Sequence, residues 1–348
     1  MNEDFWRGRR VLVTGHTGFK GAWLCLWLQS LGAETAGLAL EPATEPNLWS
    51  LLGAPADSTI GDIRDPACVR ATLDRHRPQV VFHLAAQALV RDSYRDPLGT
   101  YATNVMGTAN LLDACRDRRD LRAVVVVTSD KVYANDGAAA AFEETDRLGG
   151  HDPYSSSKAC TELVTASFRD SFFQGGAPMA TVRAGNVIGG GDWSADRLIP
   201  DCVRALDHGA AVSLRYPDAV RPWQHVLDPL AGYLLLAKTL LAAPAAAPPA
   251  VNFGPDPESF CTVAGVVDAF SACFGGRPGW VRDPQPHPPE AATLRLSSAL
   301  AARTLGWRPR LPIGEALSWT AEWHRAMRAG DDMKRYSLNQ ISRFRHDI

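Results

Sequence analysis

The first half of the chain alternates short apolar runs with amphipathic stretches of helical length. The apolar runs predict strands at 9–15, 34–40, 79–86, 121–128 and 179–185, with one more strand before Asp62. The stretches between them predict helices at 18–31, 66–76, 98–118 and 154–173. This alternation is typical of a parallel sheet covered by helices on both faces. We therefore predict an α/β fold with a doubly wound parallel sheet.

After residue 185 this rhythm breaks, and irregular stretches rich in Gly, Pro and Asp separate short elements. A helix at 228–242 and a strand at 251–254 predict a return of the chain to the sheet, and the Ala/Pro stretch between them predicts a loop. The predicted units are a sheet domain (1–185, with 224–254 returning to it), a smaller C-terminal lobe (186–223 and 255–330) and a C-terminal tail (331–348).

Four consecutive valines, 124–127, predict a strand that is buried on both faces. Such a strand should end in small polar residues, but this one ends in Thr128, Ser129, Asp130 and Lys131. One interpretation is a surface turn with two solvated charges, which are common and contribute little. The other is an acid and a base placed for chemistry at the end of a central strand.

Composition narrows the class of protein. The 348 residues are 46% hydrophobic and carry a net charge of −2, which allows a large core and indicates no nucleic-acid or membrane surface. The polar N-terminus lacks the apolar run of a signal peptide, and no stretch approaches the length of a membrane span. The seven cysteines are scattered without a CxxC pair, and no cluster has metal-site spacing. We predict a cytoplasmic protein with reduced cysteines and no metal.

The motif GHTGFKG follows the first predicted strand and opens the first predicted helix. Glycines let the backbone turn tightly and approach a pyrophosphate, which the free N–H groups of the helix N-terminus can bind. The alternative is a tight turn without a ligand. In this position the motif predicts a dinucleotide cofactor and a Rossmann-type sheet, with contacts from Gly15, Thr17, Gly18, Phe19, Lys20 and Gly21.

Recognition of the cofactor's adenosine is less clear from the sequence. Ala39 stands where the second strand usually ends in an acid that binds the ribose, and Glu41 lies two residues further on. No arginine follows at once to bind a 2′-phosphate, so NAD is favoured over NADP. Asp62 and Ile63 are candidates for the adenine edge, although Asp62 could equally cap the helix that starts near Pro66.

Tyr154 and Lys158 lie four residues apart on a predicted helix and therefore on one face of it. A tyrosine has an ordinary pKa of about 10. A nearby ammonium, together with a positive nicotinamide ring, favours the phenolate and lets Tyr154 act as a base near neutral pH. Tyr-x-x-x-Lys alone is common by chance, but it gains weight beside Thr128, Ser129 and the glycine-rich loop.

These motifs carry a family resemblance that covers nearly the whole chain. With FHLAAQALVRDSYRDPLGTYATNVMGT, RAGNVIGGGDW, DRLIPD and RPWQHV, they resemble the extended short-chain dehydrogenase/reductase family of nucleotide-sugar enzymes. Related enzymes of dTDP-sugars carry Thr-Asp-Glu in place of Ser129, Asp130 and Lys131, and the Asp-Lys pair is similar to the branch that acts on CDP-sugars. The resemblance implies an NAD-dependent lyase acting on CDP-glucose or a related nucleotide sugar. Hydride would pass from carbon 4 to NAD and back to carbon 6, with water lost across carbons 5 and 6.

The resemblance also assigns residues to roles. It implies catalysis by Ser129, Asp130, Lys131, Tyr154 and Lys158. It implies further cofactor contacts from Leu84, Ala85, Ala86, Gln87, Asn104, Thr128, Tyr154 and Lys158, and substrate contacts from Arg91, Ser93, Asn186, Arg197, Leu198, Pro200 and Arg221. Asn104 could instead be a solvated or capping residue, and Trp23, Trp27, Trp223 and His225 are expected to pack rather than react. A homodimer or homotetramer is implied, built on the helices at 98–118 and 154–173.

Several alternatives stay open at this point. In the implied reaction Lys131 is the base at carbon 5 and Asp130 the acid, but Lys131 could instead pair only with a phosphate or with Asp130. A 4-epimerase, or a dehydratase of dTDP- or GDP-sugars, would share the fold. An NADP-linked reductase and a non-catalytic dinucleotide sensor are further rivals. Residues 134–150 resemble a lid or a surface loop.

Overall fold

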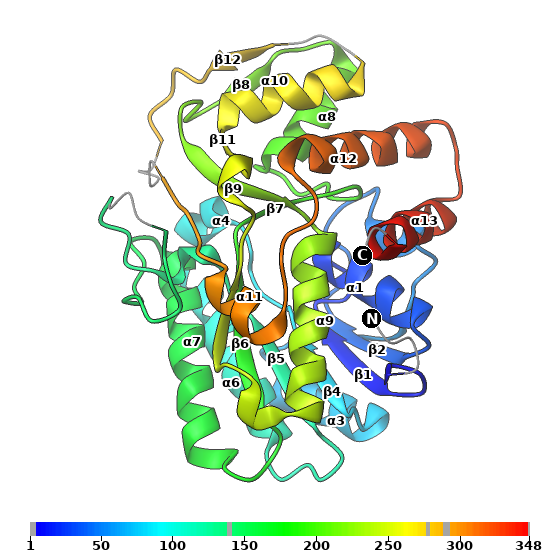
Figure 1. Ribbon diagram of the computed structural model, residues 1–348, viewed down its shortest axis with the longest axis vertical. Coiled ribbons are helices and arrows are strands. Elements are labelled where there is room, and N and C mark those ends of the chain that lie inside the picture. Colours follow the sequence, from blue (N-terminus) through cyan, green and yellow to red (C-terminus); the bar gives the residue numbers. More distant parts are fainter. Residues whose placement is uncertain (1–4, 138–140, 276–278, 288–292, 347–348) are drawn as a thin grey trace.

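The computed structural model describes residues 5–137, 141–275, 279–287 and 293–346 (Figure 1). Its largest element is a seven-stranded sheet in the order β10-β6-β5-β4-β1-β2-β3, in which every neighbouring pair is parallel. The strands are β1 (Arg10–Thr14), β2 (Glu34–Ala39), β3 (Asp57–Ile60), β4 (Val80–His83), β5 (Ala123–Val127), β6 (Met179–Ala184) and β10 (Ala250–Phe253). The predicted α/β class with a doubly wound parallel sheet is confirmed.

Helices cover both faces of this sheet, as the valine run in β5 requires. Side chains alternate along a strand, and Val125 and Val127 belong to the core on one face while Val124 and Val126 belong to the core on the other. The first face is covered by α1 (Phe19–Ser30) and α9 (Leu227–Ala242), and the second by α3 (Pro66–His76), α6 (Gly107–Cys115) and α7 (Pro153–Phe172).

The helix predicted at 98–118 is interrupted by a π-helical turn. It consists of α5 (Pro97–Tyr101), the π-helix η2 (Ala102–Met106) and α6 in succession. Within this turn Asn104 is buried: its Oδ1 accepts from the backbone N–H of Gln87 (2.8 Å), and its Nδ2 donates to Ser157 Oγ (2.8 Å). π-Turns are often found at functional sites, and this one links the loop after β4 to α7.

A smaller lobe lies across one end of the sheet, at the top of Figure 1. It contains a three-stranded sheet of β7 (Asn186–Ile188), β9 (Val220–His225) and β11 (Phe260–Thr262), and the pair β8 (Val212–Leu214) and β12 (Trp280–Arg282). Its helices are α8 (Leu198–His208), α10 (Val263–Phe274) and α12 (Ile313–Arg328). Between β9 and β11 the chain returns to the large sheet through α9 and β10, where the sequence predicts a helix and a strand.

The predicted C-terminal tail contains a helix, α13 (Met333–His346), and residues 347–348 lie outside the described part. Phe344 packs edge-on against Trp27 of α1, with ring centroids 5.7 Å apart, so α13 contacts the sheet domain. The remaining elements are α2 (Leu48–Leu51), α4 (Val90–Arg95), α11 (Ala299–Leu305), η3 (Asp130–Val132), η4 (Pro244–Ala246) and η5 (Pro257–Ser259).

Three further findings concern sequence-based expectations. All seven cysteines are free thiols. Among the described residues, no helix has the length and apolar character needed to cross a bilayer. In the same part of the chain, no group of three or more His, Cys, Asp or Glu residues is placed to hold a metal ion. Within the loop predicted at 134–150, residues 138–140 lie outside the described part.

Candidate active site

A cleft of about 1090 Å³ collects the residues that the sequence predicted for the site. Residues from the loops that follow β1, β4 and β5 line it on one side, and residues from β7, β9, α8 and their loops line it on the other. Of all the predicted cofactor, substrate and catalytic residues, only Ser93 and Asn104 do not line it. Ser93 is buried, and its hydroxyl donates to the carbonyl of Val90 (2.6 Å).

The glycine-rich loop forms one end of the cleft with its backbone. Gly15 has a φ of +75°, and a Cβ at this position would lie 2.7 Å from the backbone nitrogen of Ala85. At Gly21 a Cβ would lie 2.2 Å from the carbonyl oxygen of Gly15. Gly18 is the N-cap of α1 without a side-chain cap, and no acid stands in the first turn. The loop can therefore present backbone N–H groups to an anion, and the diphosphate of a dinucleotide fits this cradle.

The adenosine end of the cleft has no carboxylate at the end of β2. That strand ends at Ala39, and the carbonyl of the following residue, Leu40, accepts a hydrogen bond from Thr17 Oγ1 (2.9 Å). Asp62 does not cap α3, because Asp65 is the N-cap. Asp62 instead accepts bonds from the backbone N–H of Arg64 (2.8 Å) and from its guanidinium. The hydrogen bond from the Arg64 side chain holds the pKa of Asp62 below its usual value.

Tyr154 and Lys158 are both buried where α7 begins, and Asp152 caps this helix by accepting from the backbone N–H of Ser155 (2.9 Å). Lys158 Nζ donates to the carbonyl of Val127 (3.0 Å), and burial lowers the pKa of Lys158 to about 8. Burial raises the pKa of Tyr154, although a hydrogen bond with Ser129 acts in the opposite direction. The chain by itself thus favours the phenol. The phenolate expected from the sequence needs further positive charge in the cleft.

Asp130 and Lys131 do not form a solvated surface turn. They lie in the short 3-10 helix η3, whose N-cap Ser129 accepts from the backbone N–H of Lys131 (3.2 Å) and donates to Asp130 Oδ1 (3.0 Å). Asp130 is 2% exposed, and its Oδ2 has no hydrogen-bond partner among the described residues. Burial raises the pKa of Asp130 and so favours the protonated acid. Lys131 is half-buried, lines the same cleft and makes no side-chain hydrogen bond within the described part.

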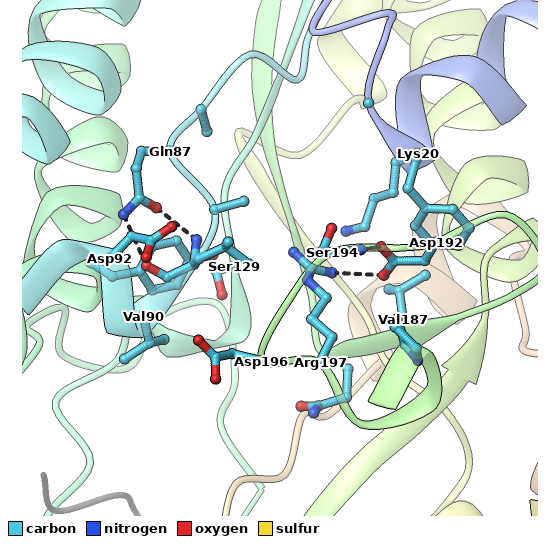
Figure 2. A pocket seen from close by; sticks show the side chains of 18 of the residues that line it. Lys20, Gln87, Val90, Asp92, Ser129, Val187, Asp192, Ser194, Asp196 and Arg197 are labelled. Atoms are coloured by element: carbon cyan, nitrogen blue, oxygen red, sulfur yellow. Dashed lines mark hydrogen bonds and ion pairs between the residues drawn. The ribbon is translucent and has the colours of Figure 1, made fainter. Parts of the chain in front are cut away.

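On the opposite wall, charged side chains from the 189–197 loop define the cleft (Figure 2). Arg197 Nη1 lies 3.6 Å from Oδ2 of the buried Asp192, whose Oδ1 accepts from the backbone N–H of Ser194 (3.0 Å). Asp196, with a φ of +60°, pairs with Nη1 of Arg91 at 2.6 Å. Arg91 therefore links α4 of the sheet domain to this loop of the smaller lobe.

Sequence reasoning missed several polar and charged residues that line the cleft, among them Asp192, Asp196, Arg215, Tyr216 and Asp283. The GGGDW motif contains Asp192, but its pairing with Arg197 depends on the course of the loop. Trp223 is buried in the core, as expected, and it also lines the cleft, where its Nε1 donates to the carbonyl of Cys261 (3.2 Å). Trp23, Trp27 and His225 are fully buried core residues, as expected.

The fold and the cleft together define the class as a Rossmann-fold protein with a dinucleotide-binding loop and a catalytic Tyr-x-x-x-Lys pair beside it. The family model described as the NAD dependent epimerase/dehydratase family matches residues 11–252, and the chain belongs to that family. The resemblance to extended short-chain dehydrogenases is thereby confirmed, and NAD is the cofactor of this family.

Individual relatives narrow the class further. The chain is 46% identical over 350 residues to the CDP-glucose 4,6-dehydratase of Salmonella typhimurium, with 98% of each chain covered. It is 29% identical over 336 residues to a dTDP-glucose 4,6-dehydratase of Xanthomonas campestris pv. campestris, which covers 90% of this chain and 92% of that protein. Among solved structures, the NAD complex of the Thermus thermophilus UDP-glucose 4-epimerase matches with a TM-score of 0.79 and 27% identity. That match covers 91% of this chain and 99% of the epimerase.

Proposed function

We propose that the protein is a hydro-lyase that uses NAD to convert CDP-glucose into CDP-4-keto-6-deoxyglucose. The observation that carries this proposal is the pair Asp130–Lys131, held in the cleft beside Tyr154 and Lys158. An epimerase needs no second acid–base pair, because it only removes and returns a hydride at carbon 4. The similarity to a CDP-glucose 4,6-dehydratase, at 46% identity against 29% for the dTDP-glucose enzyme, supports the choice of CDP.

The cofactor would be held mainly by the glycine-rich loop, with the diphosphate at the N-terminus of α1. Ile63 and Asp62 would lie at the adenine, and Ala85 to Gln87 along the rest of the molecule, since all of them line the same cleft. When bound, NAD supplies a hydride acceptor at carbon 4 and a hydride donor at carbon 6. Asn104 acts from outside the cleft by holding the backbone of Gln87 in place.

In the oxidation step, Tyr154 takes the proton of the 4-hydroxyl. The hydrogen bond between Ser129 and Tyr154 lowers the pKa of Tyr154 and so favours the phenolate, against the effect of burial. Lys158 adds positive charge close to the tyrosine, and its burial beside the carbonyl of Val127 fixes the position of that charge. These contacts orient the base before the sugar arrives, which is how fixed dipoles and charges assist a proton transfer.

In the elimination step, Lys131 removes the proton from carbon 5 and Asp130 donates a proton to the leaving 6-hydroxyl. Asp130 suits the acid role because burial raises its pKa and its Oδ2 is not engaged by other described residues. Its Oδ1 accepts from Ser129, so the carboxyl is held with the other oxygen free. Lys131 suits the base role because it lines the cleft and its amine makes no hydrogen bond within the described residues.

The nucleotide end of the substrate would lie against the smaller lobe. Arg197 and Arg221 line the cleft there and can bind phosphate oxygens through their planar guanidinium groups. Asn186 lies at the start of β7 on the same wall. Leu198 and Pro200, in the first turn of α8, provide apolar surface suited to a nucleobase.

A panel of nucleotide sugars tests the proposal directly. The purified protein is incubated with NAD and with CDP-, dTDP-, UDP- or GDP-glucose, and the 4-keto product is followed by its absorbance in alkali. CDP-glucose should turn over far faster than the others. Equal turnover of dTDP-glucose would assign the enzyme to another branch. A 4-epimer without keto product would identify an epimerase, and net NADPH oxidation a reductase. Binding of NAD alone would identify a sensor.

We also propose that the protein is a cytoplasmic homodimer, with a homotetramer as the alternative. Large apolar side chains are exposed on α5, η2 and α7, which pack beside one another: Leu98 is 81% exposed, Met106 56%, Leu163 59% and Phe172 49%. Exposed apolar side chains on neighbouring helices are what a two-fold helix bundle would cover. Sedimentation at micromolar concentration should give a dimer or larger species. Leu163→Glu should shift it towards the monomer, and a wild-type monomer would refute the proposal.

A further inference from the structure

Lys20 is the one cation that the glycine-rich loop contributes to the cleft. It lies in the first turn of α1, and its half-buried side chain lines the cleft. Figure 2 shows this side chain extending away from α1 towards Asp192 and Arg197 of the smaller lobe. The residue therefore begins at the cofactor loop but ends at the wall assigned to the nucleotide sugar.

The ammonium of Lys20 has charged neighbours from several elements. Asp130 and Asp192 attract it, whereas Arg197 and Lys158 repel it. Within the described part of the chain its Nζ makes no hydrogen bond or ion pair. Burial, followed by the charges of Arg197 and Lys158, lowers the pKa of Lys20 to about 7. An anion that binds at this junction would raise the pKa of the Lys20 amine. The amine would then take up a proton from solvent and attract the anion.

Two anions are expected to meet at this junction. The diphosphate of NAD belongs at the N-terminus of α1, where Lys20 originates, and that of the nucleotide sugar belongs at Arg197, towards which Lys20 extends. Two diphosphates in one cleft repel each other, and the repulsion is strong where water is partly excluded. A cation between them lowers that repulsion for both ligands at once.

We infer that Lys20 is a positioning residue shared by the two ligands, and that it couples the binding of NAD to the binding of the nucleotide sugar. The inference rests on the proposed function, because it requires a diphosphate against Arg197. It goes beyond that function in assigning to one side chain of the cofactor loop an effect on substrate affinity. The coupling is reciprocal. When Lys20 is removed, NAD should bind more weakly to the protein that already holds the nucleotide sugar, and the nucleotide sugar should bind more weakly to the protein that already holds NAD.

Calorimetry without turnover tests the coupling. The dissociation constant of NAD is measured with and without saturating CDP, which carries the diphosphate but has no sugar to react. The coupling ratio is the dissociation constant of NAD without CDP divided by the constant with CDP. Lys20→Met should lower this ratio by at least about fivefold, the lower end of measured couplings. Lys20→Arg keeps a cation and should retain the wild-type ratio. Lys334→Met, on α13 and outside the cleft lining, is the control for losing a lysine.

Proton uptake gives a second readout that a structural role would not alter. At pH 8 a group with a pKa of about 7 is mostly neutral, and nearby phosphates raise its pKa, so Lys20 should take up a proton as the ligands bind. Titrations of CDP into NAD-loaded protein, in two buffers of different ionisation enthalpy, count that proton. This proton uptake should disappear in both Lys20→Met and Lys20→Arg. The coupling between NAD and CDP should disappear only in Lys20→Met, because Lys20→Arg keeps a cation. The comparison with wild type removes the contributions of Lys158 and Asp130.

The possible failures are distinguishable. If CDP does not bind the wild type, the proposed function is overturned and the inference falls with it. If CDP binds but Lys20→Met leaves the ratio and the proton count unchanged, the proposed function stands and the shared role of Lys20 is wrong. A loss of NAD affinity alone, with an unchanged ratio, would make Lys20 an ordinary cofactor contact and would likewise overturn the inference.

Discussion

The two walls of the cleft are built in different ways. The cofactor wall consists of three short continuous segments: the loop Gly15–Gly21, the turn 128–131 and the start of α7. Within each segment, backbone groups and neighbouring residues form the site. On the substrate wall, side chains from separate loops meet and are held by ion pairs, such as Arg197 with Asp192 and Arg91 with Asp196.

This contrast has a physical basis in what each wall must recognise. A diphosphate at a helix N-terminus is bound by N–H groups that every sequence possesses, provided that glycine permits the approach. The sugar nucleotide must be distinguished from similar molecules, and side chains with specific charge and shape are needed for that. The substitutions below separate the two walls, starting with the largest expected effect.

The largest loss of activity is expected at Lys131, whose replacement should block the elimination step but not the oxidation step. Lys131→Met should lower product formation, and solvent-deuterium exchange at carbon 5 with it, by about 10²–10⁴-fold, as is typical for loss of a general base. Reduction of bound NAD by CDP-glucose should persist, because Tyr154 serves the oxidation. Stopped-flow absorbance and mass spectrometry measure the two steps. Unchanged exchange would show that Lys131 only pairs with a phosphate or with Asp130.

The next effect concerns the support beneath the cofactor wall. Arg183 on β6 and Glu162 on α7 form an ion pair at 2.9 Å, with side chains 3% and 4% exposed. Breaking a buried pair costs about 3–5 kcal/mol because one charge remains buried alone. Arg183→Met should lower the free energy of unfolding by about that amount in urea titrations. Arg169→Met, which breaks a more exposed pair with Asp170, is the matched control. Equal effects of the two substitutions would contradict the prediction.

A third substitution tests whether the backbone makes the cofactor wall. Gly15→Ala places a Cβ 2.7 Å from the nitrogen of Ala85 at a φ of +75°, and such strain costs on the order of 1–3 kcal/mol. NAD should bind about ten- to a hundredfold more weakly in calorimetry, whereas the affinity for CDP changes little. Gly314→Ala, in α12 and outside the cleft lining, is the control, since its Cβ would meet no other atom within 4 Å. An equal loss of CDP affinity would show that the two walls are not separable.

The sequence predicts the parts of the fold and site that depend on local residues better than the parts that depend on distant contacts. Local sequence determines β5, through its valine run, and the start of α3, through the pair Asp65–Pro66. The predicted bounds of both elements agree with the observed bounds within two residues. The π-turn at 102–106 and the packing of α13 were not predicted, because they depend on distant contacts such as Phe344 with Trp27. Placing Arg91 beside Asp196 requires bringing together residues 105 positions apart, which no local pattern encodes.

The smallest effect is expected at Arg91, the link between the two walls. Its ion pair with Asp196 is short at 2.6 Å, but the side chains are 40% and 26% exposed, so water screens the charges. Exposed pairs of this kind contribute up to about 1 kcal/mol. Arg91→Met should therefore lower the free energy of unfolding by less than about 1 kcal/mol, well below the effect of Arg183→Met, in the same urea titration. If Arg91 also contacts the sugar, the KM for CDP-glucose should rise while the affinity for CDP, which lacks the sugar, stays the same. Asp196→Asn removes the pair but keeps Arg91, and should reproduce the change in stability without the change in KM. A shared rise in KM for both variants would mean that the ion pair itself orders the substrate wall, and that Arg91 does not reach the sugar.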